Sequence, residues 1–303
     1  MGLLRDLYTA WARFADAREA EPRRTMFTHA LPVFDLPQRK PLPEDLPQIA
    51  IVTPCKNAAR DLGPYFALID ALDYPKGKLH LRMLEGDSDD ETYARAKTML
   101  AERDPSHAST GLIKLDLNVD LGTGSRSRAS VQRSRRSAIA TCRNRLLQAA
   151  METPAKFILF IDVDMAVIPP NRLKRALEWN APILMANCLT HDGARVFDRN
   201  AFFYTRPVSD RSARRYVRDG IYQPPGGYFR HYPEPDSLAE IEPLHSVGGT
   251  FLLIRRDVIE AGADFPQEPY QLHLETEGFA LKAADLGFGA FMPPRLVVRH
   301  GPH

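Results

Sequence analysis

The sequence predicts an α/β fold in which helices flank a mostly parallel central sheet. Short apolar segments alternate with segments of helical periodicity through the first half of the chain, as is typical of a doubly wound sheet. The 303 residues, 44% hydrophobic and 26% charged, are enough to bury one large core. We therefore expect one domain over residues 48–303, after an N-terminal helix and a proline-rich lead over residues 1–47.

The expected strands are apolar runs bounded by turn residues, and the expected helices follow residues that favour helix N-termini. Strands are expected at residues 48–53, 79–84, 112–117, 157–161 and 246–255, with a final strand or extended arm at residues 288–298. Helices are expected at residues 62–72, 91–103, 137–151 and 272–286. Strand and helix thus alternate, which supports the α/β class.

Two segments lack periodicity. Residues 119–136 are rich in Gly, Ser and Arg and predict a mobile loop, whose five arginines could close over phosphates or simply be solvated. Residues 187–242 are dense in Tyr, Arg, Pro and Gly, and we interpret this long segment as the wall on the substrate side.

Charge, cysteines and hydropathy exclude several classes. The formal net charge is only +2, so there is no global electrostatic case for a nucleic-acid partner. The three cysteines are far apart and lack a Cys-x-x-Cys spacing, which argues against a disulfide framework or a zinc site. No run reaches the about 18 apolar residues of a membrane span and no signal-peptide core is found, so we expect a cytoplasmic protein.

The N-terminal lead contains one amphipathic segment, Leu3 to Ala17. Its apolar residues recur at helical spacing, with arginines on the other faces. Packing in the core or against a second subunit of a homo-oligomer is the favoured interpretation, and peripheral contact with a membrane is the alternative.

The most informative segment is the apolar run Phe157–Ile161, which ends in Asp162-Val163-Asp164. Alternate residues of a strand point to the same side, so Asp162 and Asp164 can face one crevice. In open α/β sheets ligands bind outside the carboxyl ends of strands, where two carboxylates can hold a divalent cation against a diphosphate. The alternative is that the pair merely ends a strand or caps the next element.

Polar residues also follow the first two predicted strands. Pro54, Lys56 and Asn57 follow the first, and Asp87 and Asp89 follow the second, where a nucleotide would lie at the sheet edge. As an alternative, the two aspartates are helix caps.

Three further groups complete the candidate site. Arg136 and Arg143 are seven residues apart, hence on one helical face, and either guanidinium could contact a diphosphate in bidentate fashion. Glu275 and Glu277 supply two carboxylates, although acids also suit the start of a helix. His300 is a late histidine that could equally be a surface residue near the end of the chain.

Six motifs between about residues 49 and 300 resemble the fungal Golgi α-mannosyltransferases of the Anp, Van and Mnn type, which build mannan on the GT-A glycosyltransferase fold. The motifs are Thr53-Pro54-Cys55-Lys56-Asn57-Ala58-Ala59, Asp87-Ser88-Asp89-Asp90-Glu91-Thr92, Arg143-Asn144-Arg145-Leu146-Leu147, Asp162-Val163-Asp164, Ser246-Val247-Gly248-Gly249-Thr250 and Glu275-Thr276-Glu277-Gly278. The order of the last three is the most specific part of the resemblance.

The resemblance implies a retaining transferase that uses GDP-mannose and Mn²⁺ (or Mg²⁺), with residues 48–164 as the nucleotide-binding half and residues 165–303 as the acceptor-side half. Asp164 would be the principal metal ligand, with His300 as a further ligand, and Asp162 would bind the ribose or the metal through water. An imidazole nitrogen beside carboxylates favours Mn²⁺.

The resemblance also implies roles for the remaining candidates. Arg143 would contact the diphosphate or support the acids, and Glu275 and Glu277 would lie on the β-face of the transferred sugar. Residues expected to line the nucleotide pocket are Pro54, Lys56, Asn57, Asp87 and Asp89, with Arg136 at the diphosphate. In a retaining reaction of this type the acceptor hydroxyl attacks on the face that the nucleotide leaves, and the leaving phosphate takes the proton.

Because no apolar run is long enough to span a membrane, we expect no membrane anchor, and the chain also carries an arginine-rich loop; both features depart from the fungal pattern. We therefore expect a soluble, bacterial homologue acting on a glycan or glycolipid acceptor at the inner membrane face. Three alternatives stay open at this point: a metal-dependent nucleotidyltransferase, a UDP-sugar-dependent transferase of the same fold, and a non-enzymatic binding module.

Overall fold

The computed structural model describes residues 34–117, 129–206, 208, 210–225 and 229–302. Its centre is an eight-stranded sheet with strand order β12-β14-β6-β13-β4-β1-β2-β3. The strands are β1 (Ile49–Cys55), β2 (Leu79–Glu85), β3 (Ser109–Lys114), β4 (Phe157–Ile161), β6 (Ile183–Met185), β12 (Glu242–Leu244), β13 (Phe251–Arg255) and β14 (Ala290–Met292). Strands β3, β2, β1 and β4 run parallel, whereas β13 is antiparallel to β4 and β6. The expected mostly parallel sheet is confirmed.

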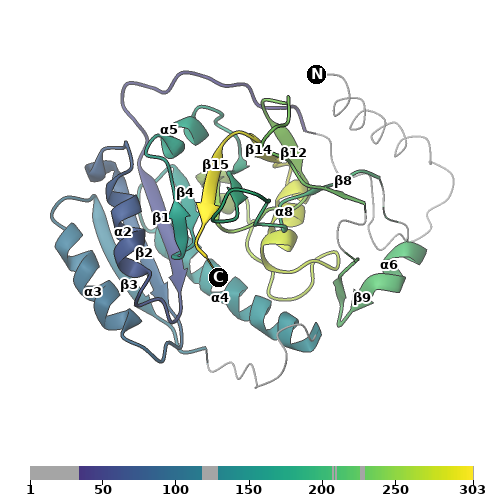
Figure 1. Ribbon diagram of the computed structural model, residues 1–303, viewed down its shortest axis with the longest axis horizontal. Coiled ribbons are helices and arrows are strands. Elements are labelled where there is room, and N and C mark those ends of the chain that lie inside the picture. Colours follow the sequence, from purple (N-terminus) through teal and green to yellow (C-terminus); the bar gives the residue numbers. More distant parts are fainter. Residues whose placement is uncertain (1–33, 118–128, 207, 209, 226–228, 303) are drawn as a thin grey trace.

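Helices cover both faces of this sheet because both faces of its central strands are apolar. Ile49 and Ile51 of β1 face the core under α2, α3 and α5, while Ala50 and Val52 face the core under α4, α7 and α8. The helices are α2 (Leu62–Asp70), α3 (Thr92–Arg103), α4 (Ala129–Met151), α5 (Arg172–Leu177), α6 (Asp210–Tyr216), α7 (Arg256–Glu260) and α8 (Glu275–Asp285), with a 3₁₀ turn at Lys76–Lys78. Figure 1 shows α2 and α3 beside β1 to β3, and α4 along the lower edge.

A second sheet of three strands brings the end of the chain back to the centre. It consists of β5 (Met165–Val167), β15 (Val297–His300) and β7 (Asn187–Leu189), in that order. His300 pairs with Met165, so the last strand ends beside the segment that follows β4. Figure 1 shows β15, in yellow, near the centre of the molecule.

A smaller lobe extends from this body. It contains the short strands β8 (Phe203–Tyr204), β9 (Val217–Arg218), β10 (Ile221–Tyr222) and β11 (Arg230–His231). Its own apolar cluster is centred on Phe202, Tyr204 and Tyr222. Among the described residues, no helix is both long and apolar enough to cross a membrane.

Several expected boundaries were wrong. Strand β3 begins at Ser109 instead of residue 112, because its register with β2 starts at His80 and Ser109. The last expected strand, residues 288–298, is divided between β14 and β15. Pro293 and Pro294 lie between them, and proline lacks the N–H that a sheet needs.

Helix α4 begins at Ala129, so residues 129–136 are helical and not a loop. Arginines of this segment are held by distant carboxylates: Arg133 pairs with Glu268, and Arg136 with Glu275. Local amino-acid composition cannot predict ion pairs between residues so far apart in the sequence. The remainder of the expected loop, and the expected helix at residues 3–17, lie outside the described residues.

The expected strand at residues 246–255 is shorter, since β13 begins only at Phe251. The residues before it form a loop, in which Gly249 donates its backbone N–H to Asp198 Oδ2 at 3.1 Å. The carboxylate of Asp198, and not a neighbouring strand, is therefore the hydrogen-bond acceptor for the N–H of Gly249.

Acid should destabilise the smaller lobe through His245. Burial lowers the pKa of His245 to about 3, whereas an unfolded histidine titrates at about 6.5. The unfolded chain therefore binds more protons between these values, so this residue makes the unfolding free energy rise with pH, by up to about 1.4 kcal/mol per unit. His245→Asn keeps an acceptor for the N–H of Tyr204 and should flatten the slope of stability between pH 4.5 and 6.5, measured by urea unfolding.

The exposed His191 provides the control, because His191→Asn should leave that slope unchanged. Identical slopes for His245→Asn and the unaltered chain would contradict the assignment.

Candidate active site

A cavity of about 340 Å³ opens at the carboxyl ends of β1, β2 and β4. This is the edge where open α/β sheets bind ligands. The loops after the strands, α4 and the first residue of α8 supply its walls, which include Pro54, Lys56, Asp87, Arg135, Ala138, Ile139, Cys142, Arg143, Asp162, Asp164 and Glu275.

Asp162, Asp164 and His300 form a cluster beside this cavity. One ligand atom from each lies within 4.8 Å of the others, and His300 Nε2 is 3.0 Å from Asp164 Oδ1. The Nδ1–H of His300 donates to the carbonyl of Gly301 at 3.2 Å, which leaves Nε2 for the cluster. Two carboxylates and one imidazole are a donor set that fits Mn²⁺.

The protonation of the cluster reflects its burial. Burial deep in the cavity raises the pKa of Asp162 to about 7, against the lowering effect of Arg143 and with the support of Asp164. Burial lowers the pKa of His300, but its hydrogen bond and ion pair with Asp164 outweigh this and leave it raised. A divalent cation bound here would add positive charge beside Asp162 and Asp164 and would favour their ionised forms.

Arg143 connects the cluster to α8. Its Nη2 is 3.5 Å from Asp162 Oδ1, and its Nε–H donates to Glu275 Oε1 at 3.0 Å. The guanidinium also lies 5.2 Å from the centroid of the Phe160 ring. Because its side chain is only 6% exposed, the two carboxylates are needed to compensate its buried charge.

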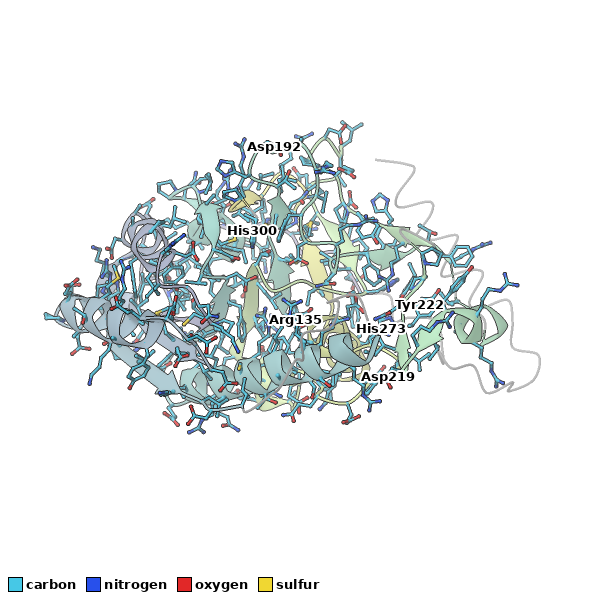
Figure 2. The ribbon with its side chains drawn as sticks, turned by 60° about the horizontal axis from the view of Figure 1, so that its bottom comes forward. Arg135, Asp192, Asp219, Tyr222, His273 and His300 are labelled. Carbon is cyan, nitrogen blue, oxygen red and sulfur yellow. The ribbon has the colours of Figure 1, made fainter. Side chains whose placement is uncertain are left out.

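The alternation of charge continues away from the cavity. Arg136 lies 3.5 Å from Glu275 and 3.7 Å from Glu277, and Arg230 lies 3.9 Å from the other oxygen of Glu277. We call this series the charge ladder, from Asp162 through Arg143, Glu275, Arg136 and Glu277 to Arg230. It ends at the aromatic cluster of the smaller lobe, where Tyr222 and His273 lie near each other in Figure 2.

Glu275 occupies a strained position at the start of α8. Its φ is +56°, in the left-handed region that costs a residue with a side chain about 1 kcal/mol or more. Two arginines hold its carboxylate there. Burial would raise the pKa of Glu277, but Arg136 and Arg230 outweigh it and lower that pKa, so both glutamates are held by positive charge.

The absence of side chains at Gly248 and Gly249 allows two charged side chains to lie close to the backbone. A Cβ at Gly248 would lie 1.8 Å from Asp198 Oδ2, and a Cβ at Gly249 would lie 2.0 Å from Arg143 Nη2. Asp198 is buried and also accepts from the hydroxyl of Thr250 at 3.2 Å. Asp198 was not predicted, because a single aspartate in an irregular segment carries no sequence pattern.

Arg135 differs from the arginines of the charge ladder. It lines the cavity, and among the described residues it has no carboxylate partner. Figure 2 shows Arg135 on the side of α4 that faces the middle of the molecule and His300. The sequence suggested that arginines of this segment could meet phosphates, but selected Arg136, which the charge ladder engages. Among the described residues that line the cavity, Arg135 and Lys56 are thus the cationic groups without a carboxylate partner.

The predicted nucleotide residues are brought together only in part. Pro54, Lys56 and Asp87 line the cavity, and Asp87 Oδ1 accepts the N–H of Leu117 at 3.0 Å. Asn57 and Asp89 are not among its lining residues. Asn57 Oδ1 accepts the N–H of Asp89 at 2.8 Å, which ties the two loops together, so their contact with a nucleotide stays a prediction.

Of the other predicted residues, Arg143, Asp162, Asp164 and Glu275 line the cavity, whereas Arg136 and Glu277 lie further along the charge ladder. His300 reaches the cluster from β15, and its role as a metal ligand stays a prediction.

The overall fold is shared with solved glycosyltransferases. A mannosyltransferase from Pyrobaculum calidifontis, solved with GDP-Man and Mn²⁺, superposes with a TM-score of 0.53 and 16% identity, over 99% of this chain and 69% of that one. GalNAc-T7, solved with UDP, GalNAc and Mn²⁺, gives a TM-score of 0.51 and 13% identity, over 92% of this chain and 49% of that one. The chain thus has the GT-A fold of these glycosyltransferases.

Residues 38–269 match the Anp1 family, and the chain belongs to this family. It is 26% identical over 271 residues to the mannan polymerase complex subunit mnn9 of Schizosaccharomyces pombe, covering 84% of this chain and 80% of that protein. It is also 26% identical over 275 residues to the mannan polymerase II complex anp1 subunit of the same yeast, of which it spans only 64%. Both relatives are fungal, so the expected bacterial source is not borne out.

Gly249→Ala should destabilise the protein because the new methyl group would displace Arg143 from its two carboxylates. We expect the unfolding free energy to fall by about 2 kcal/mol, within the range of overpacked buried sites. Gly63→Ala is the matched control, since a Cβ there meets nothing within 4 Å and alanine favours the helix. Urea unfolding of both variants checks this, and equal stabilities would refute the steric account.

Proposed function

We propose that this protein is a retaining, metal-dependent transferase that moves mannose from GDP-mannose to a glycan or glycolipid acceptor. The observation that carries the proposal is the cluster of Asp162, Asp164 and His300 beside a cavity with available cations, at the carboxyl end of a parallel sheet. In this proposal residues 48–164 supply the nucleotide side and residues 165–303 the acceptor side.

The donor would lie in the cavity with its nucleotide against Pro54 and Asp87. A volume of about 340 Å³ is in the range of small-ligand sites. Arg135 and Lys56 would bind the diphosphate, because neither has a carboxylate partner among the described residues, whereas Arg143 is neutralised by Asp162 and Glu275. Arg143 would then act by holding those two acids in place.

Asp164 and His300 would hold Mn²⁺, with Asp162 as a third ligand or as a partner of the ribose. The bound ion would neutralise the negative charge that develops on the leaving phosphate. The structure of the archaeal mannosyltransferase with GDP-Man and Mn²⁺ supports the choice of donor and metal by similarity of fold. The names of the fungal relatives, as subunits of mannan polymerase complexes, support mannose and are consistent with an oligomer.

In the reaction, the acceptor hydroxyl oxygen forms a bond to the anomeric carbon on the face from which the nucleotide departs. The bond between that carbon and the β-phosphate oxygen breaks, and the hydroxyl proton passes to the leaving phosphate. Arg135 and Lys56 stabilise the phosphate as it gains charge. Glu275 has an arginine at each carboxylate oxygen, so its proposed role is to orient the sugar and stabilise positive charge, not to accept a proton.

The first test is a thermal-shift titration with GDP, UDP and ADP, each with and without Mn²⁺. A ligand that binds the native state raises the apparent stability, so GDP with Mn²⁺ should raise the midpoint most. Asp164→Asn should abolish the Mn²⁺-dependent part of the shift, since it removes one anionic ligand. A larger shift with UDP would exclude GDP-mannose as the donor, and an unchanged shift in Asp164→Asn would exclude the metal assignment.

Arg135→Met should lower kcat/KM for mannose transfer about 100-fold, the scale of losing one group that stabilises developing charge. Arg133→Met is the matched control, because Arg133 lies on the same helix but pairs with Glu268 and Asp219. Steady-state assays of both variants, with thermal midpoints to verify folding, check this. Equal losses would show that α4 needs its arginines for structure and not for the donor.

A further inference from the structure

A hairpin brings Phe197 back to the cluster of Asp162, Asp164 and His300. After β7, the chain turns between Thr190 and Arg195, where the N–H of Thr190 donates to the carbonyl of Arg195 at 2.9 Å. The N–H of Phe197 then donates to the carbonyl of Cys188 at 2.8 Å. Since Cys188 pairs with Val298 in the three-stranded sheet, this register delivers Phe197 beside the end of β15. Figure 2 shows Asp192, on this hairpin, at the upper edge of the molecule above His300.

Phe197 stacks on the imidazole of His300. The two ring centroids are 3.8 Å apart and the ring planes differ by 16°. A face-to-face contact this close restricts rotation of the imidazole about its χ2 angle. It therefore keeps Nδ1 on the carbonyl of Gly301 and Nε2 at 3.0 Å from Asp164.

The next residue, Asp198, is connected by hydrogen bonds to Asp162, on the other side of the cluster. Its Oδ2 accepts from the N–H of Gly249 at 3.1 Å and from the hydroxyl of Thr250 at 3.2 Å. The carbonyl of Thr250 in turn accepts the N–H of Asp162 at 3.3 Å. Asp198 thus fixes the backbone from which Asp162 projects.

We propose that Phe197 and Asp198 form a positioning element, the Phe197-Asp198 brace, that holds His300 and Asp162 in the geometry needed for a divalent cation. Neither residue belongs to the cluster of ligand atoms. Partners that orient metal ligands in this way contribute about 10-fold to 100-fold to metal affinity. The inference rests on the proposed metal site and deepens it.

The brace has a testable alternative, in which Phe197 only fills space against the core. Phe197 is partly exposed and packs against the larger apolar cluster, so a leucine would satisfy that role almost as well. A leucine has no flat face for the imidazole. Phe197→Leu and Phe197→Tyr therefore separate packing from stacking, because tyrosine retains the ring and the partial exposure gives its hydroxyl access to water.

The experiment is a Mn²⁺ titration of the nucleotide-free protein, followed through the electron paramagnetic resonance signal of free Mn²⁺. Phe197→Leu should weaken Mn²⁺ binding about 10-fold, whereas Phe197→Tyr should bind within about twofold of the unaltered chain. Phe288→Leu, at a partly buried position in the opposite core, controls for the loss of any phenylalanine. Asp198→Ala should weaken binding as well, and if it does not fold, Phe197→Leu still decides the question.

A crystal structure of metal-free Phe197→Leu supplies a readout that needs no metal. His300 should leave its position against Asp164. Equal Mn²⁺ affinities for Phe197→Leu and the unaltered chain, or an unmoved His300, would overturn the brace. If the unaltered chain binds no Mn²⁺, the proposed metal site fails, and the position of His300 in the crystal alone decides whether Phe197 orients it.

Discussion

The buried guanidinium of Arg143 is the constraint on which the candidate site depends. A cation with 6% exposure must be paired, and its two partners come from segments far apart in the sequence, Asp162 after β4 and Glu275 at the start of α8. The same requirement explains why Gly249 has no side chain and why Glu275 accepts a left-handed backbone. Removing either partner would leave an unpaired charge in the core, so the same ion pairs stabilise the fold and hold the site residues in place.

The charge ladder also divides the arginines of α4 by function. Arg143 and Arg136 are neutralised within the protein, and their ion pairs hold Glu275 and Glu277 in position. Arg135 is not neutralised by any described residue and faces the cavity. Residues 135 and 136 are adjacent, yet a helix turns by about 100° per residue, so one lines the cavity and the other enters the charge ladder. A bound diphosphate with Mn²⁺ would contact Arg135 and Lys56, which are not paired with carboxylates among the described residues.

Comparison of the expected and observed site shows which signals were local. The end of β4 was found at the expected residue, because an apolar run followed by two acids depends on neighbouring residues alone. His300 was assigned to the metal only through the family resemblance, since nothing near it in sequence indicates Asp164. Phe197 and Asp198 were missed altogether. Their contacts at the site come from a hairpin register and from a sheet that joins β5, β15 and β7, and neither leaves a periodic pattern.

The sequence by itself determined the α/β class, most of the elements up to β4, and the acids at the carboxyl edge of the sheet. These features follow from periodicity and from turn chemistry, which act over a few residues. Only the tertiary structure decided which arginine faces the cavity, where α4 begins, and how Phe197 and Asp198 contact His300 and the backbone beside Asp162. Those outcomes depend on ion pairs and ring contacts between residues about 100 positions apart, such as Phe197 with His300, whose distances are fixed only when the sheets have formed.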